Sequence, residues 1–258
     1  MSSCLLIGPP GSGKTTAACT LAKLYPLGVI DFDNKLHKME NVKHLLRSKE
    51  NPIGNLIQIP IDCKLSTISL REMATTKLEQ GGKQTSARPE GYMKFVEITE
   101  KLQKDKYKWE GVQLGGIVLD SYTTMQEHLK RLLLSANDKM TMSLPLYGPF
   151  LTNLEEVNNI FIRMPIDVII IAHEKMEKDP LTERIIVRPM VEGSMDGKIA
   201  KDFEEVYYMQ KVISGLGAGT TAKYEMMTIG DSMRSARTSR KQAALVEPDF
   251  SKIFGGGK

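Results

Sequence analysis

Short apolar runs alternate with longer amphipathic segments along most of this chain. A continuous apolar run bounded by glycine or aspartate is typical of a strand buried on both faces of a parallel sheet. The amphipathic segments between such runs are typical of helices that cover the sheet. Strands are expected at residues 4–7, 27–32, 55–61, 115–120 and 167–172. The pattern therefore predicts an α/β fold with a mostly parallel sheet flanked by helices.

Helices are expected where apolar residues recur at helical spacing. These segments are residues 16–24, 66–80, 89–104, 121–135 and 150–164, with a polar, glycine-rich break at 81–86. Residues 137–149, which are rich in Met, Ser and Pro, are predicted to form a loop. Pro165 is expected to end the helix before it.

The pattern changes after residue 172, where apolar and polar residues begin to alternate. This period of two predicts antiparallel strands at residues 182–188, 204–212 and 221–229, added near the C-terminus. Residues 215–219 read as a hairpin turn, and residues 251–258 are expected to fray. The length of 258 residues suits one large domain. We therefore expect a domain at residues 1–245 and a C-terminal tail at 246–258.

A glycine-rich segment joins the first predicted strand to the first predicted helix and matches the pattern G-x-x-x-x-G-K-T. Its residues are Gly8, Pro9, Pro10, Gly11, Ser12, Gly13, Lys14, Thr15 and Thr16. Glycines let such a loop wrap closely and point its N–H groups at phosphate. Lys14 is expected to contact the β- and γ-phosphates, and the hydroxyl of Thr15 to contact Mg²⁺. A plain turn needs no Lys-Thr pair at this spacing, so the segment predicts a nucleotide-binding P-loop.

Acidic residues follow two of the predicted strands, at the edge where parallel sheets bind ligands. Asp120 is expected to hold Mg²⁺ as the Walker B acid, which makes it a metal-binding and catalytic candidate. The alternative is that Asp120 and Ser121 cap the following helix. Asp31 and Asp33 lie at the end of another strand, and Asp33 is the candidate that orients the attacking water. Here the alternative is a helix cap near Lys35.

His173 and Glu174 follow the strand predicted at residues 167–172. A polar group at this point would face the γ-phosphate, so His173 is a candidate catalytic residue that senses hydrolysis. The alternative is a solvated histidine at a strand end beside a charged neighbour.

Basic residues gather in two later segments, residues 174–197 and 233–241. Flexible basic segments can follow a phosphate backbone. The candidates for DNA contact are Lys175, Lys178, Arg184, Arg188, Arg234, Arg237 and Arg240. Spacing of three would place the late arginines on one helical face, and one of them could instead reach a neighbouring subunit's nucleotide. The alternative for both segments is a solvated basic surface.

Bulk properties add few limits. The net charge of +4, from 35 Lys and Arg against 31 Asp and Glu, is compatible with a nucleic-acid partner without requiring one. Cys4, Cys19 and Cys63 are expected to be reduced thiols, as in cytosolic proteins. No segment reads as a signal peptide or approaches the length of a membrane span, so we expect a cytoplasmic protein without a membrane partner.

With these motifs laid out, the chain resembles P-loop ATPases of the RecA/RadA recombinase type. More narrowly, it resembles the short, core-only ATPases of bacteriophages that act in single-strand DNA annealing and recombination. The resemblance covers about residues 3–212. It rests on G-P-P-G-S-G-K-T-T (8–16), V-I-D-F-D (29–33), G-I-V-L-D-S (116–121) and I-I-I-A-H-E (169–174).

The resemblance implies a RecA-like fold, ATP and Mg²⁺ as cofactors, and ATP hydrolysis, with Asp120 as the Walker B acid. It also implies single-stranded DNA as a partner, a possible single-strand-binding protein, a homo-oligomer, and the host cytoplasm for a phage-encoded protein. Asp33 stands where recombinases carry a catalytic glutamate, and His173 and Glu174 stand where they carry an Asn-Gln pair. The DNA-binding loops of the family would fall near residues 139–149 and 175–197 by order alone.

Two other functions fit the same motifs. One is a nucleotide-regulated interaction module in replication, packaging or defence, with little turnover. The other is a P-loop kinase for a small molecule, although the arginine-rich run lies later than a kinase lid would place it. Stimulation of ATP hydrolysis by single-stranded DNA would select the recombinase function.

Overall fold

The computed structural model describes residues 2–61, 90–137, 139, 141–179, 183–215 and 221–255. The helix predicted at residues 66–80, the break at 81–86, most of the turn at 215–219 and Cys63 lie outside them. Cys4 and Cys19 are free and buried, as predicted.

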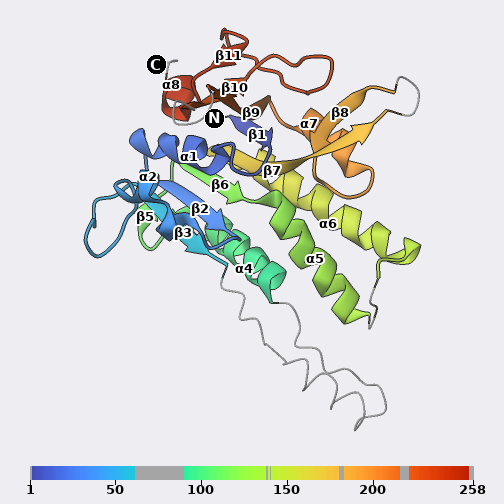
Figure 1. The fold of residues 1–258 in the computed structure, drawn as a ribbon. Coiled ribbons are helices and arrows are strands. Elements are labelled where there is room, and N and C mark those ends of the chain that lie inside the picture. The colour runs from blue at the N-terminus through green and yellow to red at the C-terminus, as the bar shows by residue number, and fades with distance from the viewer. Residues whose placement is uncertain are drawn as a thin grey trace, which may run out of the picture.

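The described residues form one central sheet with helices on both faces (Figure 1). Its strands follow the order β11-β10-β9-β1-β7-β6-β2-β3, and β8 pairs with β7 beside this path. All pairs from β9 to β3 are parallel, whereas β8, β10 and β11 pair antiparallel. The strands are β1 (Ser3–Gly8), β2 (Leu27–Asp31), β3 (Leu56–Pro60), β6 (Gly116–Asp120), β7 (Asp167–Lys178), β8 (Ile185–Pro189), β9 (Glu205–Ser214), β10 (Thr221–Met227) and β11 (Leu245–Val246). A separate hairpin joins β4 (Lys108–Trp109) and β5 (Val112–Gln113).

Helices cover the two faces of the sheet unequally. One face carries α1 (Lys14–Cys19), the 3₁₀ turn η1 (Thr20–Lys23), α2 (Glu40–Lys43) and α8 (Phe250–Gly255). The other face carries α4 (Gly91–Lys104), α5 (Tyr122–Ala136), α6 (Leu144–Ile162) and α7 (Met195–Asp202). A second 3₁₀ turn, η2 (Leu36–Lys38), follows β2. None of these described helices combines the length and apolar character needed to cross a membrane.

Strand β1 shows why the apolar runs form the centre of the sheet. Cys4 and Leu6 pack into the cluster beneath α1 and α8, while Leu5 and Ile7 pack into the cluster beneath α4, α5 and α6. Alternate side chains of a strand point to opposite faces, so a strand covered on both sides must be apolar throughout. The α/β fold with a mostly parallel sheet and antiparallel C-terminal strands is therefore confirmed. The weakest predicted strand, which contains Pro60, is the edge strand β3, where proline leaves no ladder donor missing.

The prediction of a loop at residues 137–149 is wrong for its second half. Helix α6 begins at Leu144 and continues through Pro149. Pro145 lies in the first turn, where the missing N–H has no helical acceptor. Pro149 follows one turn later, so little regular helix precedes it. The prolines of this segment mark the start of a helix.

Strand β7 extends beyond the predicted end at Ala172 and forms a hairpin with β8. The sequence pattern missed the extension because residues 173–178 are mostly polar. The predicted strand at 182–188 is β8 from Ile185 onwards. The predicted strand at 204–212 is β9, which runs parallel to β1 and antiparallel to β10.

The expectation that residues 251–258 fray is wrong for the described part. Phe250–Gly255 form α8, in which Phe250 is fully buried and Ile253 is nearly so. The N–H of Phe250 donates to Thr20 Oγ1 at 2.8 Å, and Lys23 pairs with Asp249 at 2.8 Å. These contacts attach residues 249–255 to the helical segment that follows the P-loop.

Candidate nucleotide-binding site

The loop between β1 and α1 has the backbone of a phosphate-binding loop. Gly11 and Gly13 have φ angles of 74° and 85°, in the left-handed region that favours glycine. A Cβ on Gly8 would lie 2.4 Å from the carbonyl oxygen of Met209, so the neighbouring strand leaves room only for glycine. The sequence motif therefore folds as predicted.

Lys14 is buried in the loop, with 6% of its surface exposed. Its Nζ donates to the carbonyl oxygens of Gly8 at 2.7 Å and Pro9 at 2.8 Å. Burial lowers the pKa of Lys14 to about 8, against the opposing charges of Asp120 and Glu174. A buried cation held by two neutral carbonyls is favourably placed to receive an anion.

Thr15 and Asp120 bring the P-loop and the end of β6 together. The hydroxyl of Thr15 donates to Asp120 Oδ2 at 2.6 Å. Burial raises the pKa of Asp120 to about 6, while the Thr15 hydrogen bond acts in the opposite direction. A hydroxyl and a carboxylate side by side are oxygen ligands of the kind that Mg²⁺ prefers, so these residues fit the ion. The alternative that Asp120 is a helix cap is not what the structure shows, because Ser121 is the N-cap of α5.

The two aspartates after β2 have different surroundings. Asp31 is buried and accepts hydrogen bonds from the N–H groups of Lys35 and Leu36, both at 2.9 Å. Asp31 therefore caps η2, which is the alternative to a catalytic role that the sequence left open for this residue. Asp33 accepts from Thr124 Oγ1 at 2.9 Å and from Lys35 Nζ at 2.8 Å. Its side chain is partly exposed at 21%. The role of Asp33 in orienting a water stays a prediction.

His173 lies beside the P-loop, because it is the register partner of Gly8 in the β1–β7 pair. Its backbone N–H donates to Thr123 Oγ1 at 3.0 Å, while its buried Nδ1 atom has no hydrogen-bond partner among the described residues. Burial lowers the pKa of His173, and the charge of Lys14 adds to this effect. Glu174 accepts from the hydroxyl of Tyr208 at 2.5 Å. The role of His173 as a sensor of hydrolysis stays a prediction.

The structure thus brings together Lys14, Thr15, Asp33, Asp120 and His173, while their roles stay predictions. Sequence reasoning missed Thr124, which links Asp33 to α5. Its place three residues after the N-cap Ser121 was the available signal, because such positions share a helix face.

The basic residues of the β7–β8 hairpin are engaged with acids. Lys175 Nζ lies 2.9 Å from Asp196 and 2.7 Å from Glu177. Arg188 lies 3.4 Å from Asp196. The more exposed Lys178 pairs with Glu183 at 3.5 Å. DNA contact by these residues stays a prediction, with Lys178 and Arg184 at the outer end of the hairpin.

The late arginines do not share a helical face, because residues 228–244 contain no helix. Arg234 Nη1 donates to Gln210 Oε1 at 2.9 Å, and its guanidinium lies 5.1 Å from the centre of the Tyr208 ring. Arg237 donates to the carbonyl oxygens of Ala200, Lys201 and Phe203, at the end of α7.

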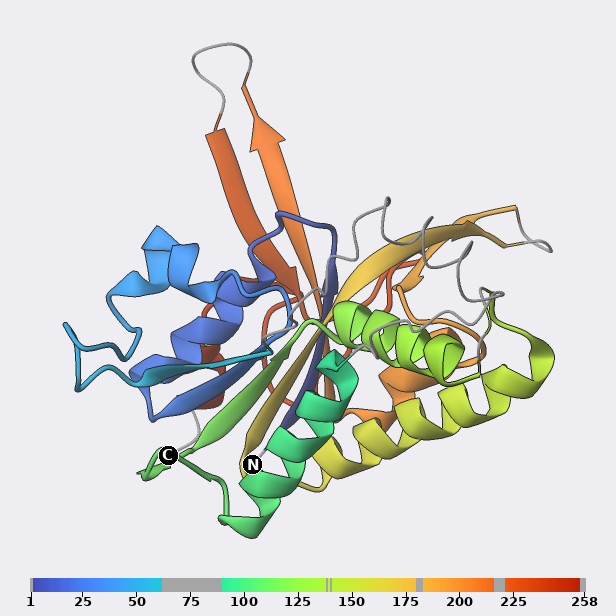
Figure 2. The same cartoon turned by 90° about the horizontal axis from the view of Figure 1, so that it is seen from below.

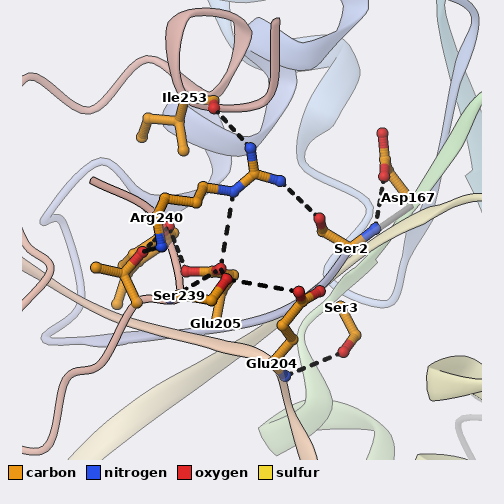
Figure 3. A network of polar contacts seen from close by, with 10 residues as sticks. Ser2, Ser3, Asp167, Glu204, Glu205, Ser239, Arg240 and Ile253 are labelled. Carbon is orange, nitrogen blue, oxygen red and sulfur yellow. Dashed lines mark hydrogen bonds and ion pairs between the residues drawn. The ribbon is translucent and has the colours of Figure 1, made fainter. Parts of the chain in front are cut away.

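Arg240 lies in a polar network that joins distant parts of the chain (Figure 3). Its Nη2 donates to Ser2 Oγ at 2.6 Å, and its Nη1 to the carbonyl oxygen of Ile253 at 3.0 Å. Its Nε lies 3.7 Å from the fully buried Glu205, which also accepts from Ser239 Oγ at 2.5 Å. A phosphate contact by Arg234, Arg237 or Arg240 would have to displace internal partners.

Fold and site together define a P-loop NTPase. The P-loop strand β1 and the Walker B strand β6 are separated by β7, with the nucleotide motifs at the carboxyl ends of the strands, as in RecA-like ATPases. The chain belongs to the family AAA_24, described as an AAA domain, whose sequence profile matches residues 2–239. Membership of this P-loop NTPase family implies ATP as the ligand.

Among solved structures, the chain is similar to the flagellar accessory protein FlaH from Methanocaldococcus jannaschii. The identity is 12%, the similarity covers 95% of this chain and 84% of that chain, and the TM-score is 0.43. None of the curated proteins compared with the chain matches it.

Proposed function

We propose that this protein binds ATP with Mg²⁺ and hydrolyses it slowly. The observation that carries the proposal is the 2.6 Å contact between Thr15 Oγ1 and Asp120 Oδ2. It places the hydroxyl and the carboxylate of the two nucleotide motifs at one point, next to a buried lysine. Mg²⁺, when bound, would neutralise charge on the phosphates.

The protein's own residues supply the remaining chemistry. Lys14 exchanges its two carbonyl partners for phosphate oxygens, which gain more from a cation than neutral carbonyls do. Asp33, held by Thr124, orients the attacking water. An aspartate reaches one carbon less far than a glutamate, so slow turnover is expected.

The test is calorimetric titration of the purified protein with ATP, with Mg²⁺ and with excess EDTA, combined with measurement of phosphate release. We expect Mg²⁺-dependent binding and slow release. Absence of ATP binding in the presence of Mg²⁺ would reject the proposal. Binding without any release would favour the nucleotide-regulated interaction module.

We further propose that the ATPase acts on single-stranded DNA, in annealing or strand pairing. Support comes from the resemblance of the motifs to bacteriophage recombinases and from the shape of the molecule. The β9–β10 hairpin projects past the edge that carries the P-loop, and the β7–β8 hairpin extends to one side of it (Figure 2). Ordering of such segments by nucleotide is a known way to couple hydrolysis to a partner.

Hydrolysis rates measured with and without single-stranded DNA test this finer proposal. Stimulation would support it, and sedimentation of the same mixtures would show whether copies of the chain assemble. Indifference to DNA, with intact basal hydrolysis, would favour the interaction module or a small-molecule kinase.

A further inference from the structure

The β9–β10 hairpin forms one wall of the P-loop. An added Cβ at Gly13 would lie 3.3 Å from Cδ1 of Tyr224, so the Tyr224 ring packs directly against the loop. Lys211 is the cross-strand partner of Tyr224, and its Nζ lies 5.9 Å from the ring centre. This aromatic ring beside the phosphate loop has no role in the site described above.

The direction of a bound triphosphate follows from the strand order. Thr15 and Asp120 would hold the metal and the terminal phosphates, and Asp120 ends β6, which lies beyond β7 from the P-loop strand. On the opposite side of β1 lie β9 and then β10. A triphosphate chain with its γ end near β6 therefore leads its nucleoside end toward β9 and β10, where Tyr224 lies.

The exposed face of the hairpin fits an aromatic ligand. Strand alternation places Lys211, Ile213 and Tyr224 on the face that continues from the buried Met209 and Met226. Tyr224 is 41% exposed and Ile213 is 62% exposed, so this face leaves apolar surface open beside the loop. Apolar and aromatic surface with a nearby cation is what a nucleobase and its sugar-phosphate require.

We propose that Tyr224 forms the platform for the base of the bound nucleotide, with Lys211 orienting the ring. The inference rests on the proposed ATP binding and names the residue that holds the nucleoside end. It also accounts for the lack of a base-reading motif in the sequence: the platform comes from a strand more than 200 residues after the P-loop (Gly13 and Tyr224 are 211 positions apart). Stacking of this kind tolerates different bases, so little discrimination between ATP and GTP is expected.

The test compares two ligands that share the phosphates and differ in the nucleoside. Affinities for ATP and for inorganic tripolyphosphate, both with Mg²⁺, are measured by calorimetry for the natural protein, Tyr224→Ala and Tyr224→Phe. Tyr224→Ala should weaken ATP about tenfold or more and leave tripolyphosphate unchanged. Tyr224→Phe should restore ATP affinity, because it keeps the ring.

Val212→Ala is the matched control. Val212 lies on the same hairpin, 40% exposed, and points to the opposite face from its neighbour Lys211. It should leave both affinities unchanged, and thermal unfolding should show all variants folded.

Each result has one meaning. Equal loss of ATP and tripolyphosphate in Tyr224→Ala would overturn the inference, because the ring would then act only through the shape of the loop. No loss of either would overturn it too and would leave ATP binding intact. If the natural protein binds neither ATP nor tripolyphosphate, the proposed function itself is rejected, and the inference with it.

Discussion

At the scale of single residues, the site contains charged groups whose burial destabilises the protein when no ligand is bound. Burial shifts the pKa of Lys14 down to about 8 and that of Asp120 up to about 6, so each shift favours the neutral form. A charged group whose burial costs free energy without the ligand, and which contacts the ligand when it binds, is typical of functional positions. The motif residues were predictable because local backbone geometry fixes them. Thr124 offered only its spacing from Ser121, and Tyr224 offered no local signal, since its position beside Gly13 depends on tertiary packing.

Replacing Lys14 with alanine should abolish ATP binding. The variant removes the buried cation that would contact the phosphates. In the loop itself, the carbonyl oxygens of Gly8 and Pro9 each lose only one hydrogen-bond donor. Calorimetric titration with ATP and Mg²⁺ measures the loss, and circular dichroism checks the fold. Retained tight binding would contradict the role assigned to the P-loop lysine.

Asp33→Asn should keep ATP binding and slow phosphate release. The amide oxygen still accepts from Thr124, but the amide cannot take a proton from water. We expect a fall of about 100-fold, the lower end of the usual contribution of general-base catalysis. Asp31→Asn changes the neighbouring cap and serves as a control for local stability. Undiminished release in Asp33→Asn would remove Asp33 as the base.

Asp120→Asn should stabilise the ligand-free protein at alkaline pH while weakening the effect of Mg²⁺ on ATP binding. The folded-state pKa of Asp120 lies above its ordinary value. Folding therefore favours the protonated form of Asp120. This contribution to stability is complete below about pH 4 and is lost as pH rises through about 6. Asparagine imitates the protonated form, so the gain should be on the order of 1–3 kcal/mol at pH 8 and smaller at pH 5. Urea unfolding at both pH values measures it, and a less stable variant at pH 8 would contradict the argument.

At the scale of elements, the parallel strands were predictable and their continuations were not. The runs in β1, β6 and the first half of β7 are apolar throughout because helices cover both faces. Beyond the end of the parallel sheet, β7 continues with polar residues that pair with β8, and no apolar pattern predicts this extension. Helix α6 was shortened in the prediction because proline at a helix start and proline in a loop look alike in sequence.

Arg240, a predicted DNA-contact residue, has a structural partner that its charge alone does not reveal. We expect Arg240→Ala to lower the free energy of unfolding by about 3 kcal/mol, because it leaves the fully buried Glu205 without its ion-pair partner. Urea unfolding measures the loss. Arg184→Ala, at an exposed arginine of the β7–β8 hairpin, is the control and should change stability little. Weaker DNA binding by Arg240→Ala with unchanged stability would instead support the phosphate-contacting surface inferred from the sequence.

At the scale of the whole molecule, residues 250–255 pack against the central domain. The rings of Phe250 and Tyr207 lie 5.9 Å apart, and Phe250 also bonds to Thr20 in η1, which continues from α1. A chain ending at Glu247 would lose α8 and expose the apolar surface that Phe250 and Ile253 cover. The free energy of unfolding should fall by about 3–5 kcal/mol, as for loss of a large core side chain.

The full-length Phe250→Ala variant separates packing from chain length. It should reproduce most of the loss, because the other α8 contacts depend on Phe250 filling its site beside Tyr207. ATP with Mg²⁺ should still raise the unfolding temperature of both variants, since α8 packs more on η1 than on α1, and its hydrogen-bond partner Thr20 follows the phosphate loop by four residues. Equal unfolding temperatures for the shortened and natural chains would show that α8 does not dock in solution. Loss of the ATP-induced rise would instead mean that the helix after the P-loop needs α8 to hold its place.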